Sequence, residues 1–175
     1  MSTLPLFERR GAVFSPCGTY RYSLWREWGN PARLCVWIML NPSTANDVDD
    51  DPTIRRCVAF AKRWRCGSIV VVNLFGLISS DPRALLTHES AVGQDNDAAI
   101  VSASTPTITQ HVVVAWGAFS QAKTRAVEVL DMLDRRGVQL ECLGQTKDGS
   151  PRHPLYVAGD TTLVPFVRTA RRSPC

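Results

Sequence analysis

The sequence lacks most of the patterns that assign a function directly. Its longest apolar runs, such as 35–40 and 69–72, fall far short of the ~20 residues that a membrane-spanning helix needs. Six cysteines are present, but no two stand in a Cys-x-x-Cys pair, so zinc and iron–sulfur sites are not indicated. No Walker-type loop, Gly-x-Gly-x-x-Gly loop or Gly-x-Ser-x-Gly elbow occurs. These absences predict a protein without a metal, a cofactor or a membrane span.

The N-terminus and the composition bound the class of protein. The first residues, MSTLPLFERR, lack the basic-then-apolar build of a secretory signal, so we expect a cytoplasmic protein. Apolar residues make up 45% and charged residues 21% of the 175 residues, which is typical of a globular domain and not of a disordered chain. We expect one domain over 1–175, with its core at about 12–167 and a flexible basic tail at 168–175.

Lysine is scarce in this sequence. The lysines are Lys62, Lys123 and Lys147, and arginines greatly outnumber them. The net charge of +4 is a mild preference for anionic partners. Arginine suits bidentate contacts with phosphate, although genomic base composition explains an arginine excess equally well.

Strand and helix patterns alternate along the chain. Residues 12–28 read as a hairpin, and 34–40, 68–75 and 111–117 read as strands buried on both faces. Residues 138–144 alternate as a fourth strand. Helices are expected at 52–64, from Asp81-Pro82 onward, at 96–104 and at 121–136. This order predicts an α/β fold: a three-layer α/β/α sandwich with a mostly parallel central sheet of about four strands, plus the N-terminal hairpin.

Unusual polar residues stand where these strands end. Asn41 follows the first buried strand, Asn73 lies near the end of the second, Trp116-Gly117 ends the third, and the loop with His153 follows the fourth. In parallel sheets, ligands bind outside the carboxyl ends of the strands. The sequence therefore predicts that these residues converge on one site.

Each of these residues also has a purely structural interpretation. Asn41-Pro42-Ser43 is either a capped turn or an amide held in place to bind a water. Asn73 is either satisfied by a neighbouring loop or pairs with the polar edge of a base, since one carboxamide offers both a donor and an acceptor. His153 is either solvated or donates a hydrogen bond to a leaving group that gains negative charge.

The acidic stretch Asp47, Asp49, Asp50, Asp51 does not fit a calcium loop, because the central glycine and the closing glutamate are absent. Asp51 is better explained as the N-cap of the helix that begins at Pro52.

Several strings resemble one family. They are YRYSLWREW, IMLNPSTAND, DDPTIRRCVAFAKRW, VVVNLFGLISSDP, VVVAWG and CLGQTKDGSPRHPLYV. Over about residues 12–157 they resemble the bacterial and phage proteins grouped as DUF1643, a label that leaves their function open.

The order of motifs is also similar to the uracil-DNA glycosylase superfamily, and this resemblance implies roles. Asn41 would position the attacking water, Asn73 would read the base, and His153 would stabilise the departing base. Leu155 or Tyr156 would fill the gap left by a flipped nucleotide. The base pocket would also include Pro42, Ser43, Phe75, Trp116 and Gly117. The DNA contacts would also include Arg55, Arg56 and Arg152.

This sequence departs from that superfamily at four positions. Leu40 replaces the glycine that opens the first motif. Asn41 replaces the carboxylate of the fastest members, and an amide orients water but does not accept its proton. Ser43 replaces a tyrosine and leaves room for a 5-substituent, which favours a modified or damaged pyrimidine over uracil. Leu155 replaces the serine of the last motif, so that Arg152 would take over its phosphate contact.

We therefore expect a monofunctional DNA glycosylase of the repair or phage-defence type. Two alternatives remain open: a module that senses a base without cutting, and a hydrolase or transferase acting on free nucleosides or nucleotides.

Overall fold

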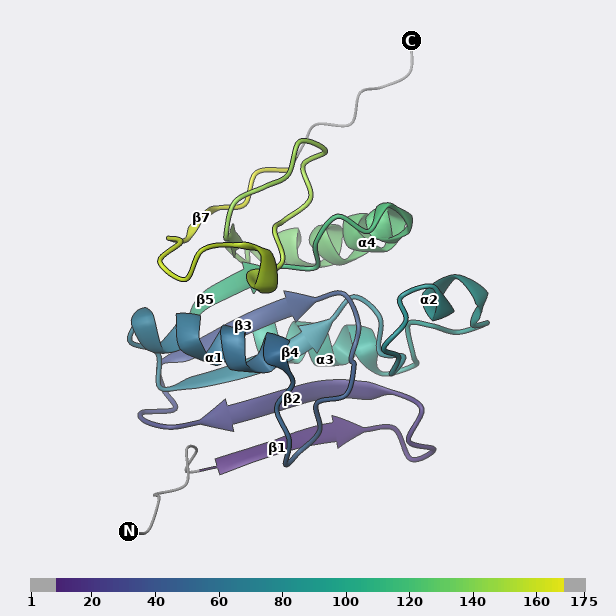
Figure 1. The fold of residues 1–175 in the computed structure, drawn as a ribbon, viewed down its shortest axis with the longest axis horizontal. Coiled ribbons are helices and arrows are strands. Elements are labelled where there is room, and N and C mark those ends of the chain that lie inside the picture. Colours follow the sequence, from purple (N-terminus) through teal and green to yellow (C-terminus); the bar gives the residue numbers. More distant parts are fainter. Residues whose placement is uncertain (1–8, 169–175) are drawn as a thin grey trace.

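A mixed sheet of seven strands, in the order β1-β2-β4-β3-β5-β6-β7, forms the centre of the fold (Figure 1). The structure is a computed structural model and describes residues 9–168. The strands are β1 (Arg9–Phe14), β2 (Arg21–Glu27), β3 (Leu34–Met39), β4 (Ser68–Asn73), β5 (Thr109–Val114), β6 (Glu141–Cys142) and β7 (Val164–Pro165). The helices are α1 (Pro52–Arg63), α2 (Ala84–Thr87), α3 (Asn96–Ser104) and α4 (Lys123–Asp134), with 3₁₀ turns η1 (Ser120–Ala122) and η2 (Pro154–Tyr156).

The α/β class is confirmed, but the predicted strand count is wrong. Strands β4, β3, β5 and β6 are parallel neighbours. The hairpin of β1 and β2 does not stand apart from them, because β2 pairs antiparallel with β4 and extends the same sheet. The short strand β7 adds a second antiparallel edge at β6. The result is one seven-stranded mixed sheet instead of a sheet of about four strands plus a hairpin.

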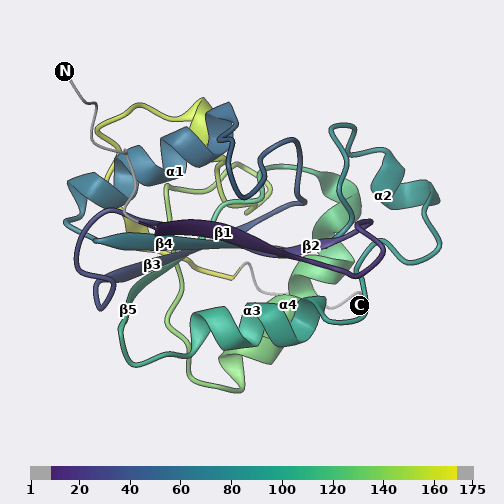
Figure 2. The same ribbon diagram turned by 90° about the horizontal axis from the view of Figure 1, so that it is seen from below.

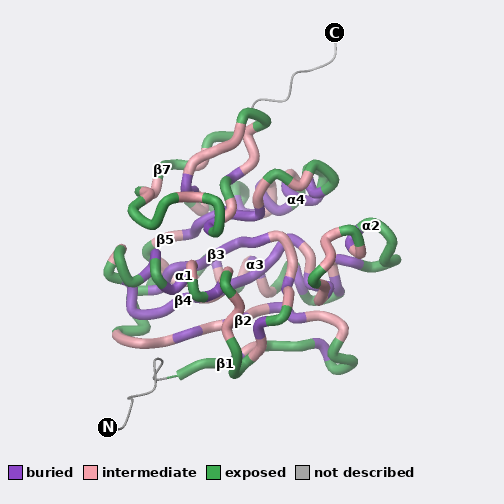
Figure 3. The backbone as a smooth tube through the Cα atoms, viewed as in Figure 1, coloured by how far each residue is buried: buried purple, intermediate pink, exposed green. Residues whose placement is uncertain are grey.

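Helices cover both faces of the sheet. Figure 2 shows α1 on one face and α3 with α4 on the other. Strand β3 is buried along its whole length (Figure 3). Its side chains therefore contribute to the apolar cores on both faces of the sheet. Trp37 packs in the cluster under α1, while Val36 and Ile38 pack in the cluster under α3 and α4. The continuous apolar pattern of this strand is explained by cover on both sides.

The register of β3 and β4 sets the position of the site. The two strands pair in parallel from Leu34↔Ser68 to Met39↔Asn73, so both end at the same edge of the sheet. Helix α1 starts from that edge, where Asp51 caps it by accepting a hydrogen bond from the Ile54 N–H at 2.8 Å. The predicted N-cap at Asp51 is confirmed.

The C-terminal part departs from the predicted elements. The strand expected at 138–144 is only Glu141–Cys142. Its C-terminal end is set by a turn at Gly144, which has a φ of +93°. Arg168, assigned to a flexible tail, forms ion pairs with Asp131 and Asp134 on α4. The rest of that predicted tail lies outside the described residues. Over residues 9–168, none of the helices has the length and apolarity to cross a bilayer.

Candidate functional site

A cavity of about 170 Å³ opens at the carboxyl edge of the sheet, where β3 and β4 end. It brings together Asn41, Asn73 and His153, which are more than 30 residues apart along the chain. Ser43 lines it as well. Its other lining residues are Arg21, Met39, Leu40, Asp51, Thr53, Ile54, Val71, Ser79, Ser80 and Pro82. We refer to it as the inner cavity.

Asn73 is the most unusual residue of the inner cavity. The residue is 1% exposed, and both its Nδ2 and its Oδ1 are buried without a hydrogen-bond partner. Its backbone is well held, because Asn96 Nδ2 donates to the Asn73 carbonyl at 2.9 Å. A buried amide without partners costs about 1–3 kcal/mol, so this side chain is not explained by stability. The alternative of a loop that satisfies the amide is not observed among the described residues.

The two polar atoms of the Asn41 carboxamide have different surroundings. Its Nδ2 donates to the carbonyl oxygens of Ser79 at 2.8 Å and Pro42 at 3.0 Å, which fixes the side chain. Its Oδ1 accepts no hydrogen bond from any residue that the structure describes. The oxygen is therefore available to a water or a ligand hydroxyl.

His153 is arranged as a neutral donor. Its Nδ1 accepts a hydrogen bond from the Leu155 N–H at 3.2 Å, so this nitrogen is unprotonated and the ring proton lies on Nε2. Burial lowers the pKa of His153, and the negative charge of Asp51 opposes that shift. The ring therefore stays neutral at pH 7.

Two charged residues of the inner cavity were not predicted as site residues. Arg21 is 2% exposed and donates a hydrogen bond to the carbonyl of Ala45, while its Nε has no partner. Burial lowers the pKa of Arg21 to about 10, with Asp51 opposing the shift. Asp51 uses Oδ1 as the cap of α1, and it is the one carboxylate that lines the cavity. The cap pattern identified Asp51 as a structural residue, whereas no sequence signal distinguishes Arg21 within the hairpin.

A β-bulge explains how Arg21 reaches the cavity. Strands β1 and β2 pair regularly to Val13↔Ser23, and the register then shifts so that Phe14 lies opposite Arg21. Such a shift breaks the alternation of side chains and re-aims the residues beyond it.

The comparisons with known proteins bear on the same residues. A family model described as "Protein of unknown function (DUF1643)" matches residues 21–155. The chain belongs to the DUF1643 family. This match begins at Arg21 and includes every lining residue of the inner cavity. No curated protein and no solved structure matched the chain.

In this DUF1643 protein a second hollow, the outer groove, adjoins the inner cavity through Pro82 and His153, which line both. The outer groove has a volume of about 480 Å³. Trp116 and Gly117 lie here, not in the inner cavity where they were expected to meet the base. The remaining lining residues are Ala118, Phe119, Thr146, Arg152 and Tyr156.

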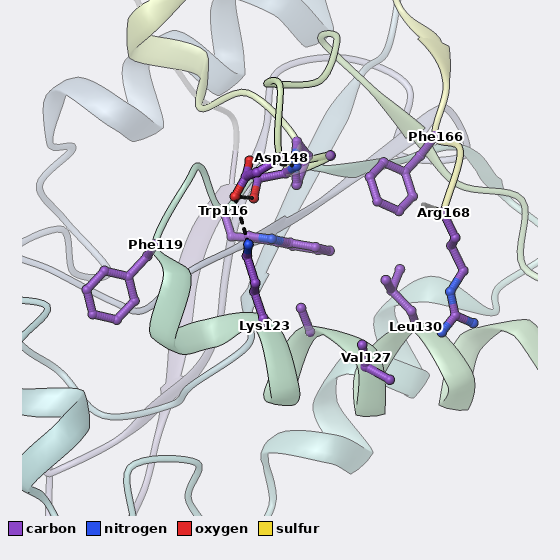
Figure 4. A pocket seen from close by; sticks show the side chains of 12 residues that line it. Trp116, Phe119, Lys123, Val127, Leu130, Asp148, Phe166 and Arg168 are labelled. Atoms are coloured by element: carbon purple, nitrogen blue, oxygen red, sulfur yellow. Dashed lines mark hydrogen bonds and ion pairs between the residues drawn. The ribbon is translucent and has the colours of Figure 1, made fainter. Parts of the chain in front are cut away.

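Trp116 and Phe119 line both the outer groove and a third pocket. Figure 4 shows this pocket, of about 300 Å³, between Trp116 and the start of α4. Lys123 there forms an ion pair with Asp148 at 3.1 Å, and Arg168 is held by the α4 carboxylates. Its two cations are therefore neutralised by the protein itself.

Two predicted pocket residues do not line the inner cavity. Phe75 lines none of the three hollows and packs between the apolar clusters under α2, α3 and α4. Pro42 is buried, and its carbonyl accepts a hydrogen bond from the Ser79 N–H at 2.9 Å.

The predicted DNA-contact residues fall into two groups. Arg152, Leu155 and Tyr156 are exposed at the outer groove or beside it, and the Tyr156 ring lies 5.5 Å from the His153 ring. Arg55 donates to the Asp50 carbonyl at 2.5 Å, and Arg56 donates to carbonyls of the loop that follows His153. The Arg56 guanidinium is therefore engaged within the protein.

Among residues 9–168, no cluster of three His, Cys, Asp or Glu side chains is placed to hold a metal ion. Four cysteines are buried as small apolar groups, and Cys17 is exposed.

Proposed function

We propose that this protein hydrolyses the N-glycosidic bond of a flipped-out modified or damaged pyrimidine in DNA. The observation that carries the proposal is the unpartnered carboxamide of Asn73 in the inner cavity. A pyrimidine edge presents a donor and an acceptor side by side, and one carboxamide matches both. Binding the base would supply the hydrogen bonds that the protein itself does not.

The size of the inner cavity supports a single ring as its ligand. Its 170 Å³ is well below the ~300–1,000 Å³ of pockets for drug-sized ligands. A base fits this limit better than a whole nucleotide, so the sugar and phosphate would lie in the outer groove. Tyr156, which is 81% exposed, and Leu155 are suited to replace the flipped base in the stack.

The cavity residues support a hydrolytic mechanism. Asn41 Oδ1 would orient a water, and the Asp51 carboxylate would accept its proton as the water oxygen bonds to C1′. The bond between C1′ and N1 breaks, and its electron pair leaves with the base. The Nε2–H of neutral His153 would donate a hydrogen bond to the base as it gains this negative charge. Asp51 thus supplies the proton acceptor that Asn41 cannot be.

The proposal includes the finer expectations from the sequence. These are an α/β/α sandwich of the uracil-DNA glycosylase type, a cytoplasmic location, and a role in repair or in defence against phage with modified bases. Arg152 would contact phosphate from the rim of the outer groove.

A panel of oligonucleotides tests the proposal. Duplex and single strands carrying uracil, 5-hydroxymethyl, 5-carboxyl or glycosylated pyrimidines are incubated with the protein and then treated with alkali, which cleaves at abasic sites. We expect cleavage with wild-type protein from at least one modified base and none with Asn73→Leu. No cleavage from any substrate at stoichiometric protein contradicts the proposal.

One observation favours the alternative of a hydrolase or transferase acting on free nucleosides or nucleotides. The Arg56 guanidinium is bound by the protein's own loop, so this cation is not free to neutralise DNA phosphate. Salt discriminates between the two functions, since DNA affinity falls steeply with salt concentration and nucleoside affinity does not. A base-sensing module without activity would show the steep salt dependence and no cleavage.

A further inference from the structure

The two arginines of β2 are both buried, but only one has a counter-ion. Arg26 is 0% exposed and forms an ion pair with Asp50 at 2.8 Å, with further hydrogen bonds to the carbonyls of Asn46 and Trp25. Arg21 is 2% exposed and has no carboxylate within 4.0 Å among the described residues. Its Nε has no partner of any kind in residues 9–168.

A buried charge without a counter-ion is costly, because the protein does not replace the hydration that the cation loses. Asp51 is the carboxylate whose negative charge favours the charged form of Arg21. It lies beyond ion-pair distance, however, and it also acts as the N-cap of α1. The protein thus leaves the positive charge of Arg21 largely uncompensated at the wall of a cavity that is open to a ligand.

We infer that the ligand supplies the missing counter-charge: the pyrimidine bound in the inner cavity carries a carboxylate, and this carboxylate pairs with Arg21. The inference rests on the proposed function and names the substrate class for the same site. A carboxylate is a planar acceptor that matches the guanidinium group.

The placement of the cavity residues indicates which ring position carries the carboxylate. Strand β2 lies next to β4 in the sheet. The backbone N–H of Arg21 donates a hydrogen bond to the carbonyl of Gly76, which follows Asn73 closely in the chain. A group that pairs with Arg21 therefore lies beside the ring edge that Asn73 reads. C5 flanks that edge and is not bonded to the glycosidic nitrogen. Ser43, a small residue of the same cavity, leaves space for such a substituent.

Binding of free bases tests the inference on the wild-type protein alone. Uracil, 5-carboxyuracil and the neutral methyl ester of 5-carboxyuracil are titrated into the protein by calorimetry at pH 7. We expect 5-carboxyuracil to bind about 10- to 100-fold more tightly than uracil, the range for a hydrogen bond to a charged group. The methyl ester should lose this preference. Equal affinity for the acid and its ester overturns the inference.

Variants then locate the preference. Arg21→Gln removes the charge and keeps a hydrogen-bond donor, so the ratio of the affinities for 5-carboxyuracil and uracil should fall to about one. Arg21→Lys keeps a positive charge and should retain part of the preference for the acid. Arg33→Gln makes the same change on an exposed arginine at the far end of β3 and should behave as wild type. A preference that survives in Arg21→Gln, or equal losses for all three bases, contradicts the pairing.

The outcomes separate this inference from the proposed function. Binding and release of uracil without a preference for the acid leave the glycosylase proposal standing and remove the role of Arg21. If no pyrimidine binds and no base is released, the glycosylase proposal fails, and the carboxylate inference fails with it.

Discussion

The guanidinium of Arg56 donates a 2.6 Å hydrogen bond to the carbonyl oxygen of Val157, 101 positions further along the chain. A second hydrogen bond, of 3.1 Å, reaches the carbonyl of Pro154, the first residue of η2. Helix α1 therefore holds the segment that immediately follows His153, so one arginine fixes the position of the imidazole at the cavity.

We expect Arg56→Ala to lower the free energy of unfolding by about 2 kcal/mol, because two charge-assisted hydrogen bonds are lost. Urea unfolding followed by fluorescence measures this. Arg55→Ala is the control, since the neighbouring side chain is exposed and its loss should cost no more than about 0.5 kcal/mol. Equal stabilities of the two variants would show that the Arg56 hydrogen bonds do not hold the loop.

Asp51→Asn separates the two roles of that residue. Asparagine caps helices as well as aspartate does, so the free energy of unfolding should stay within about 0.5 kcal/mol of wild type. The amide does not accept a proton, and we expect base release to slow by roughly 100-fold or more. Single-turnover assays measure the rate. Asp51→Ala, which loses the cap, should also lose about 1 kcal/mol of stability. A wild-type rate in Asp51→Asn would exclude the carboxylate as the proton acceptor.

Asn73→Leu should make the protein more stable and inactive. Leucine replaces a buried amide that has no partners, so we expect a gain of about 1 kcal/mol in the free energy of unfolding. Asn96→Leu is the matched control: its Nδ2 donates to the carbonyls of Asn73 and Leu74, so this variant should lose stability. Urea unfolding measures both changes. A large loss of stability in Asn73→Leu would mean that the amide has partners in solution.

The pH dependence of stability should report His153. In the unfolded chain a histidine has a pKa near 6.5, and burial lowers the pKa in the folded protein. The unfolded chain therefore binds more protons between the two values, and stability rises with pH across that window. The contribution of His153 to the free energy of unfolding is fully present above about pH 6.5, and it is lost as the pH falls through the pKa of His153 in the folded protein.

Urea midpoints between about pH 5 and 7.5 should accordingly fall less steeply toward low pH in His153→Asn than in wild type, since asparagine does not titrate. The imidazole proton resonances should also give a midpoint below 6.5 for His153. A midpoint above this value would contradict a neutral donor.

The sequence was a good guide to the elements that have a strong local pattern. The valine-rich run at 68–75 and the Asp51-Pro52 pair identified β4 and the start of α1, because burial on both faces and capping leave clear local signals. The alternation at 138–144 located β6 but not its length of two residues, and β7 was not predicted, because the extent of such short strands depends on pairing with distant chain segments.

The candidate site was predicted in part for the same reason. Asn41 follows β3, Asn73 ends β4, and His153 lies in the loop after β6, so the parallel order alone places them at one edge of the sheet. Arg21 reaches the cavity through a register shift in an antiparallel hairpin, which the alternation of side chains does not reveal. Phe75 was expected in the base pocket from the resemblance, but its side chain packs against two apolar clusters of the core.

The bulged hairpin has a consequence for how the protein matures on the ribosome. Its Arg21 is synthesised with the second strand, whereas His153 is added only after all six strands from β1 to β6 have been synthesised. A nascent or truncated chain that ends before His153 therefore lacks one wall of the inner cavity. Binding of a ligand in this cavity requires that translation has passed the loop that contains His153.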